Sequence, residues 1–223
     1  TVDTDADTLA SYARLFARVA REENLPHFKK DALAALAALV MQCVVSYGLA
    51  GGFGAMLWVI LGYFTVLTNI LVFASFARMA ATGRMLSAGW LAGLTLWIAI
   101  VGVVYHTLLA NIWEPQGLAL WADQGLHTVT PLLTLAFWLA FAPKGGLGVM
   151  DAVRWLGWPL IYVIYALVRG IFTQKYPYPF IDLNVLTAGQ VAVNSVGLTV
   201  AFFLGGLVFV GLARALRGQN VAA

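Results

Sequence analysis

Residues 32–77 read ALAALAALVMQCVVSYGLAGGFGAMLWVILGYFTVLTNILVFASFA, and these 46 positions contain no Asp, Glu, Lys or Arg. Roughly 20 apolar residues cross a bilayer as a helix, so the stretch is too long for one membrane span and long enough for two. The glycine-rich residues 48–54 divide it, which predicts helices at about 32–49 and 56–78. This stretch indicates a polytopic membrane protein.

The composition of the whole chain has the same character. Of its 223 residues, 61% are hydrophobic and 10% are charged, whereas about 25% of the residues of a soluble domain are charged. This composition excludes an ordinary soluble enzyme, a disordered tail and a nucleic-acid-binding domain. The single cysteine, Cys43, excludes an internal disulfide and a cysteine-rich metal site.

Four more apolar segments follow, and they predict helices at about 87–109, 118–141, 152–173 and 188–213. The expected fold class is therefore all-α, a polytopic membrane protein with six transmembrane helices. Thr187 and Gln190 have the spacing of a capping box, which predicts the start of the last helix.

A polar arm precedes the first span, because residues 1–31 hold 11 of the 23 charges. Apolar residues recur there at helical spacing and predict a short amphipathic helix, on the membrane surface or against the bundle, that breaks near Pro26. These apolar residues are Leu9, Tyr12, Phe16 and Val19. A helical tail without a role is the alternative. The polar, acidic start differs from a cleavable signal peptide, and the lack of an initiator Met suggests a processed or trimmed start.

The expected organisation has three parts: a cytoplasmic arm (1–31), a six-helix transmembrane domain (32–217) and a tail (218–223). Eleven of the 13 Lys and Arg residues fall on one side of the predicted spans, and only Arg169 and Lys175 fall on the other. Basic residues are enriched in cytoplasmic loops. The distribution therefore predicts that both termini are cytoplasmic.

Polar residues gather in the second predicted helix, where residues 62–69 read GYFTVLTN. Because this helix enters from the outer side near residue 56, Thr65 lies roughly 13 Å along it at 1.5 Å per residue. Membrane threonines such as Thr65 and Thr68 often bond the carbonyl oxygen four residues earlier, which is one explanation of these hydroxyls. A catalytic hydroxyl is the other. Asn69 is costly in lipid and should face other helices.

A second polar group lies in the predicted helix at 118–141, where residues 123–131 read DQGLHTVTP. His127 falls at nearly the same depth as Thr65, since both helices enter from the outer side. A histidine can act as the general base that deprotonates a hydroxyl nucleophile. Asp123 lies one turn earlier and could fix the imidazole tautomer, as the acid of a catalytic triad does. A packed histidine bonded to a helix neighbour is the alternative.

The third group is the sequence KYPYPFID at residues 175–182, in the last outer loop. Its two prolines disfavour a helix and favour an extended segment. The loop is interpreted either as an aromatic belt at the membrane interface or as a lid over a cavity, with Asp182 pointing inward. Tyr105 and His106 lie near the outer end of the third predicted helix and would line the same space.

Together these motifs resemble a known family. The sequence is similar to bacterial six-span relatives of the androgen-induced membrane proteins, whose animal members hydrolyse branched fatty-acid esters of hydroxy fatty acids. The likeness covers most of the chain from the second helix onward and rests on YFT at 63–65, GLHTVTP at 125–131 and YPFID at 178–182. Thr68 stands where animal relatives tend to carry an acid, and the outer loop between the third and fourth helices also differs.

The resemblance implies that Thr65 is the nucleophile and His127 its partner. The chain is then expected to be a carboxylic ester hydrolase, a threonine hydrolase of the bacterial cytoplasmic membrane. It would cleave a fatty-acid ester of a hydroxy fatty acid or a similar lipid ester without a cofactor or metal. Asp123 or Asp182 would orient His127 or bind water.

The expected partners are the lipid ester and the membrane; neither a nucleic acid nor an obligate protein partner is evident. Candidate donors for the oxyanion of the reaction are Asn69, Tyr178 and Thr68. The main alternative is a membrane haem- or lipid-binding protein without catalysis, in which His106 and His127 would ligate one haem. A carrier or channel lacks support, because the sequence has no inverted repeat.

Overall fold

The computed structural model describes the backbone of residues 6–112 and 114–219 and the side chains of residues 22–112 and 114–217. This part of the chain is helical and has no β-strand. Its α-helices are α1 (Ala6–Ala50), α2 (Phe53–Ile60), α3 (Phe64–Thr82), α4 (Ala88–Val104), α5 (Leu118–Gln124), α6 (Thr130–Ala140), α7 (Val149–Arg154), α8 (Gly157–Thr173) and α9 (Ala188–Gln219). Two π-helical turns, η1 (Tyr105–Leu109) and η2 (Gly125–Val129), continue α4 and join α5 to α6, and a 3₁₀ turn, η3 (Pro179–Ile181), lies in the loop before α9.

In the part of the chain that the structure describes, five helical segments are long and apolar enough to cross a membrane: Glu22–Ala50, Phe64–Thr82, Ala88–Leu109, Val149–Thr173 and Ala188–Arg217. The sixth predicted span corresponds to α5, η2 and α6 and is not among them. This segment carries Asp123, Gln124 and His127, which lower its mean hydropathy. Over the described residues the protein is therefore all-helical with five candidate membrane spans, and the segment with the polar cluster is not one of them.

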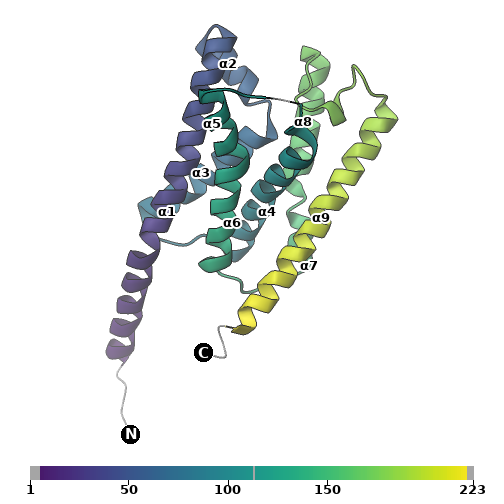
Figure 1. The fold of residues 1–223 in the computed structure, drawn as a ribbon. Coiled ribbons are helices and arrows are strands. Elements are labelled where there is room, and N and C mark those ends of the chain that lie inside the picture. Colours follow the sequence, from purple (N-terminus) through teal and green to yellow (C-terminus); the bar gives the residue numbers. More distant parts are fainter. Residues whose placement is uncertain (1–5, 113, 220–223) are drawn as a thin grey trace.

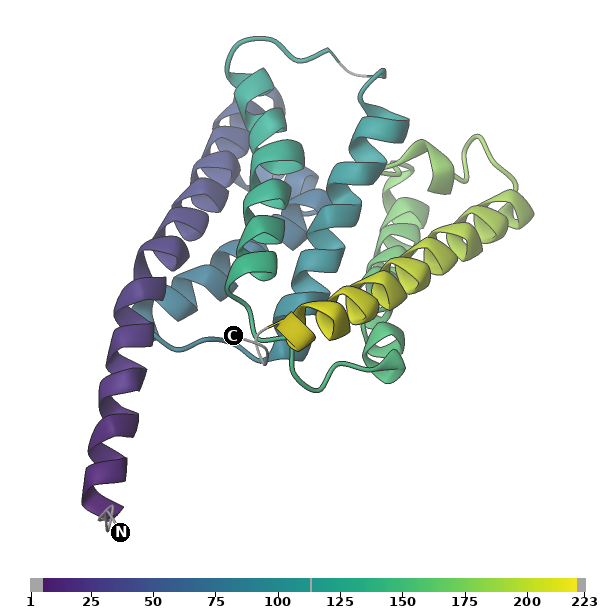
Figure 2. The ribbon, with the colours of Figure 1, turned by 60° about the horizontal axis from the view of Figure 1, so that its bottom comes forward.

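Helix α4 lies at the centre of the bundle. It contacts α3 and α6 on one side and α7 and α9 on the other (Figures 1 and 2). Its middle is buried and almost wholly apolar, with Leu91, Leu94, Leu96 and Ile98 each at most 2% exposed. A helix that is apolar all round belongs in the interior of a bundle, which is where the structure has α4.

The expected break near Pro26 is absent. Helix α1 runs unbroken from Ala6 to Ala50 and contains this proline. A proline removes one N–H from the helix and leaves the carbonyl oxygen four residues earlier, that of Glu22, without its partner. Glu22 is exposed, so water can satisfy this oxygen, and the break predicted from the sequence was wrong. The side chains of the apolar residues predicted at 9–19, and of the tail at 218–223, lie outside the described residues.

The second predicted helix, at 56–78, is not continuous. The structure ends α2 at Ile60 and begins α3 at Phe64, with Tyr63 in an extended conformation between them. Thr65 therefore lies in the first turn of a helix, whereas the sequence had indicated the middle of one. Irregular backbone at membrane depth is tolerated only where protein or water satisfies its polar groups, so the break needs partners.

Candidate functional site

Helix α8 supplies the partners of the broken backbone between α2 and α3. The hydroxyl of Tyr162 donates to the carbonyl oxygen of Gly62 at 2.9 Å, and that of Tyr165 donates to Leu61 at 3.1 Å. One turn further along, the guanidinium of Arg169 donates to the carbonyl oxygen of Trp58 and covers the ring of Trp58, 4.5 Å from its centroid. One face of α8 thus stabilises the break that places Thr65 at a helix start.

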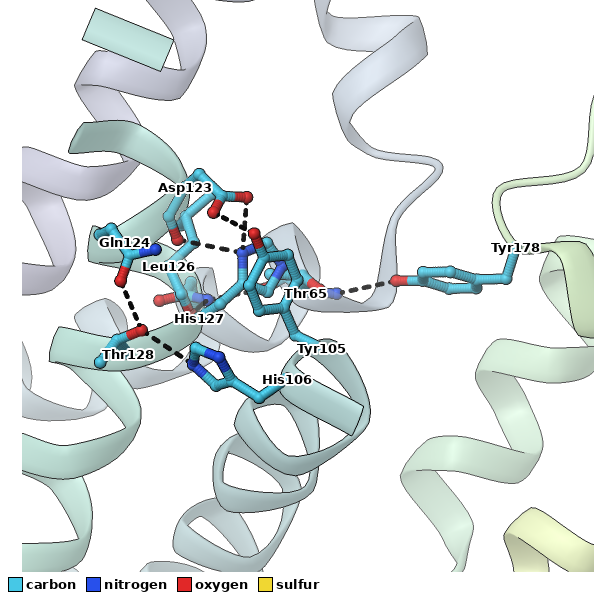
Figure 3. Close-up of polar contacts among 10 residues, drawn as sticks. Thr65, Tyr105, His106, Asp123, Gln124, Leu126, His127, Thr128 and Tyr178 are labelled. Atoms are coloured by element: carbon cyan, nitrogen blue, oxygen red, sulfur yellow. Dashed lines mark hydrogen bonds and ion pairs between the residues drawn. The ribbon is translucent and has the colours of Figure 1, made fainter. Parts of the chain in front are cut away.

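Because α3 begins at Phe64, the first backbone N–H groups of this helix have no intrahelical acceptor. The N–H of Thr65 donates to the hydroxyl oxygen of Tyr178 at 3.4 Å (Figure 3). Burial raises the pKa of the Tyr178 phenol, while hydrogen bonds from the hydroxyl and amide of Thr65 act in the opposite direction. Tyr178 therefore stays a neutral phenol at the mouth of the first turn of α3.

Thr65 does not make the local bond that is common for membrane threonines. Among the described residues, the threonines that donate to the carbonyl oxygen four residues earlier are Thr82, Thr95, Thr107, Thr173 and Thr199. The corresponding oxygen for Thr65, that of Leu61, accepts instead from Tyr165. The hydroxyl of Thr65 is therefore available to groups beyond its own helix.

Asn69 ties the helix of Thr65 to the π-helical turn that carries His127. Its side-chain nitrogen donates to the carbonyl oxygen of Thr65 at 2.9 Å and to that of Leu126 at 3.2 Å. Asn69 is fully buried, so these bonds form inside the bundle and hold the two turns together at one level. This agrees with the equal depth expected for Thr65 and His127.

The His127 ring is oriented by Asp123. Its Nδ1 lies 3.2 Å from Oδ1 of Asp123 and 3.0 Å from the backbone oxygen of the same residue. Both of these atoms are acceptors, so Nδ1 donates to them, and Nε2 is the ring nitrogen that remains to exchange a proton. Among the described residues no hydrogen bond joins this ring to the hydroxyl of Thr65.

Tyr105 completes the support of the imidazole. Its hydroxyl donates to Oδ2 of Asp123, and its ring stacks on His127 with the centroids 4.0 Å apart and the planes 14° from parallel (Figure 3). Tyr105 begins η1, whereas His127 lies in the middle of η2. Single π-helical turns are rare and occur frequently at functional sites, and here two of them present the interacting rings.

Thr65 faces an apolar cavity. The cavity is narrow, with a volume of about 90 Å³, and it is open at one side. Its polar lining is confined to hydroxyl groups, including those of Thr65, Tyr105 and Tyr178. The aliphatic and aromatic lining comes mainly from α4, α8 and α9 and includes Ile100, Val101, Leu160, Val163, Leu198 and Phe202. Such a space suits a hydrocarbon chain with one polar group at Thr65.

His127 faces a different hollow, an open groove between α4 and α6 with a volume of about 410 Å³. His106, Thr107 and Thr128 share the groove with His127, and the rest of its wall is apolar. Nε2 of His106 lies 3.0 Å from the hydroxyl oxygen of Thr128, which donates to Gln124 at 2.9 Å (Figure 3). Ligation of a haem through Nε2 of His106 would have to break this contact.

Two of the predicted site residues lie apart from this network. Thr68 is fully buried and accepts a hydrogen bond from Nε1 of Trp158 at 3.1 Å, on the side of α8. Asp182 accepts from the backbone N–H of Asn184 at 2.8 Å and closes a turn in the loop. The loop lines the cavity through Tyr178, Phe180 and Ile181. Asp182 is not among the lining residues, which differs from the inward direction predicted for its side chain.

Sequence reasoning missed the role of α8. Tyr162, Tyr165 and Arg169 are spaced three and four residues apart and so share one helix face. This spacing of two tyrosines and an arginine on one helix face, together with Gly62 in an apolar segment, was the feature of the sequence that could have indicated a helix break. Asn69, in contrast, was correctly expected to face another helix, and its bond to Leu126 shows which one.

Comparison with known proteins leaves the family of the chain open. No protein-family model, curated protein or solved structure matches it. The function of the chain is therefore inferred from the side chains and hollows described above.

Proposed function

We propose that the protein is an intramembrane carboxylic ester hydrolase that cleaves a lipid ester, such as a fatty-acid ester of a hydroxy fatty acid, with Thr65 as nucleophile and His127 as general base. One observation carries the proposal: Asn69 holds the first turn of α3, where Thr65 faces an apolar cavity, against the turn that carries an imidazole already oriented by Asp123. Membership of the family of the androgen-induced membrane proteins is part of the same proposal.

The chemistry needs no group beyond these residues, the ester and water. The hydroxyl oxygen of Thr65 attacks the ester carbonyl carbon while Nε2 of His127 takes the hydroxyl proton. The bond from carbon to the alcohol oxygen then breaks, and Nε2 returns the proton to that oxygen. Water attacks the acyl-threonine in the same way, which releases the fatty acid and restores Thr65. In the first step the Thr65 hydroxyl turns from Tyr178 toward Nε2, since catalytic hydrogen bonds often tighten only when substrate binds.

Negative charge on the carbonyl oxygen would be stabilised at the start of α3. The backbone N–H of Thr65 donates to the hydroxyl oxygen of Tyr178 beside the cavity. With substrate bound, this N–H and the Tyr178 hydroxyl proton would both be directed at the carbonyl oxygen, and a helix N-terminus favours an anion. A single oxyanion donor is worth about 3 kcal/mol in known hydrolases. Asn69 and Thr68 fit this role less well, because Asn69 spends its amide on two carbonyl oxygens and Thr68 faces Trp158.

The proposed topology has six membrane crossings, with both termini in the cytoplasm of a bacterial cell. The lower ends of α1 and α9 lie at the same end of the bundle (Figure 1), which an even number of crossings requires. The sixth crossing would be α5, η2 and α6, which run alongside α1 and α4 (Figures 1 and 2). Their polar residues are turned largely toward other helices, as intramembrane polar groups must be.

The test is hydrolysis of a model lipid ester in detergent micelles by purified variants. Thr65→Ala and His127→Ala should each abolish turnover, the double variant should be little worse, and Thr65→Ser should keep part of it. Thr95→Ala is the matched control, because Thr95 is a buried threonine of α4 that bonds only its own helix at Leu91. Undiminished turnover by Thr65→Ala would exclude this threonine as the nucleophile.

A further inference from the structure

The two members of the proposed catalytic pair face different hollows. Thr65 lines the cavity bounded by α4, α8 and α9, whereas His127 lines the groove between α4 and α6. Tyr105 marks the boundary between them, since it lines the cavity and stacks on the ring of His127. A substrate that reaches both Thr65 and His127 therefore has parts that can lie on either side of Tyr105.

The chemistry of an ester assigns these parts. The acyl half becomes attached to the nucleophile, and the oxygen of the alcohol half receives its proton from the general acid. The acyl group, bonded to Thr65, is then on the cavity side. The alcohol, which receives its proton from His127, is on the groove side.

We propose that the groove between α4 and α6 binds the alcohol half of the ester, with its hydrocarbon chain lying along the groove; this inference rests on the proposed hydrolase function. When the carbonyl carbon loses the alcohol oxygen, Nε2 of His127 supplies the proton, and the free alcohol departs along the groove. The acyl chain stays in the cavity on Thr65 until water releases it.

The lining of the groove indicates a hydrocarbon chain. Below His127, its wall consists of Ala99, Gly102, Val103, Pro131, Leu132 and Leu135. From His127 to Leu135 is eight residues, or roughly 12 Å along a helix, which is the length available to an aliphatic chain. No Lys or Arg is among the residues that line the groove, so it offers no partner for a phosphate headgroup.

The polar end of the groove gives the alcohol a second anchor. His106 and Thr128 are joined by a hydrogen bond, and Thr107 lies next to them on η1. The Thr107 hydroxyl is already bonded to the oxygen of Val103 at 2.7 Å, so His106 and Thr128 are the groups that can exchange a partner. They suit one uncharged or anionic oxygen group on the alcohol.

The experiment varies the two halves of the ester independently. One series keeps the acyl group and lengthens the alcohol, and the other keeps the alcohol and lengthens the acyl group. Leu135→Trp fills the far end of the groove and should lower kcat/KM at least tenfold for long-chain alcohols, with little effect on methyl esters. Leu198→Trp is the matched control in the cavity, and it should instead lower kcat/KM for esters with long acyl groups. If the loss of kcat/KM in Leu135→Trp varied with the length of the acyl group and not with that of the alcohol, the assignment would be overturned.

A second measurement does not depend on turnover. A long-chain alcohol with a photoreactive diazirine is crosslinked to the wild type and to Thr65→Ala, and the labelled peptides are mapped. Label concentrated on residues 99–107 and 131–135 supports the groove, and loss of that label in Val103→Trp supports it further. Label spread evenly over the lipid-facing helices would overturn it. If the groove were labelled but the protein hydrolysed no ester, the proposed hydrolase function would be refuted, and the groove would be a binding site for an alcohol.

Discussion

The substitution Tyr162→Phe removes the hydroxyl that holds the helix break next to the site. It removes one oxygen atom and keeps the ring, which packs on Phe64 with the centroids 5.0 Å apart. The carbonyl oxygen of Gly62 then loses the hydroxyl donor that lies 2.9 Å away. Tyr162 is 7% exposed and Gly62 is buried, so water does not replace that donor.

The magnitude follows from this burial. A buried carbonyl left without a partner costs about 1–3 kcal/mol, and the ring contact contributes nothing to the difference because it is retained. Tyr165→Phe is the matched control, since Tyr165 makes the equivalent bond to Leu61 at 3.1 Å but is 38% exposed. The freed oxygen of Leu61 lies nearer the surface, so the control should cost under about 1 kcal/mol.

The assay is unfolding of the purified variants in one detergent, by heat or by denaturant, with ester hydrolysis measured on the same samples. Tyr162→Phe should lose more stability than Tyr165→Phe and should also lose activity, because Thr65 lies three residues beyond Gly62. Equal losses for the two variants would contradict the argument from burial. A stable Tyr162→Phe with unchanged activity would show that the break does not position Thr65.

Three further outcomes follow from other contacts. Thr134→Val should raise the free energy of unfolding by about 1 kcal/mol, because the Thr134 hydroxyl is buried without a partner among the described residues. Thr95→Val is the control: it loses the 2.7 Å hydrogen bond to Leu91 and should not raise stability, as thermal unfolding of the two variants would show. Asp123→Asn should lower kcat, measured by steady-state kinetics, by roughly 10- to 100-fold. Replacing the acid of a catalytic triad by its amide costs about 10⁴-fold, but here the backbone oxygen of residue 123 still accepts from Nδ1 of His127. A complete loss of activity would contradict this argument. In a cysteine-free background, Thr82→Cys should resist an impermeant maleimide in intact cells while Lys175→Cys reacts, and the reverse pattern would refute the proposed orientation.

Much of the helical framework could be predicted from hydropathy alone, because the apolar segments are long and separated by charged or glycine-rich residues. The capping box at the start of α9 is confirmed: Gln190 accepts from the N–H of Thr187 at 2.9 Å and its own N–H donates to the Thr187 hydroxyl at 3.3 Å. Asp123 and His127 do interact, since i and i+4 residues share a helix face. These features depend on neighbours in the sequence.

The helix break could not be predicted in the same way. Residues 56–78 contain no proline and are apolar enough for one helix, and a single glycine such as Gly62 costs a helix only about 1 kcal/mol. The break is stable because Tyr162, Tyr165 and Arg169, about a hundred residues later in the chain, bind its carbonyl oxygens. Sequence periodicity records what a helix prefers by itself and carries no account of such distant donors.

The helical segment formed by α5, η2 and α6 shows how the bundle accommodates polar residues that are unfavourable in lipid. Its six residues from Asp123 to Thr128 include four that are costly in lipid, so α5, η2 and α6 fall outside the apolar candidates for a span. Each of the four is bonded: Asp123 to Tyr105 and His127, and Gln124 through Thr128 to His106. Gly125 allows close packing here, because a Cβ at this position would lie 2.7 Å from that of Ala38 in α1. A structural role alone would be met more cheaply by leucines, since buried polar networks cost desolvation that apolar packing does not. An imidazole oriented by Asp123 and stacked on Tyr105, which lines the cavity of Thr65, is therefore the strongest physical reason to expect chemistry at this level of the bundle.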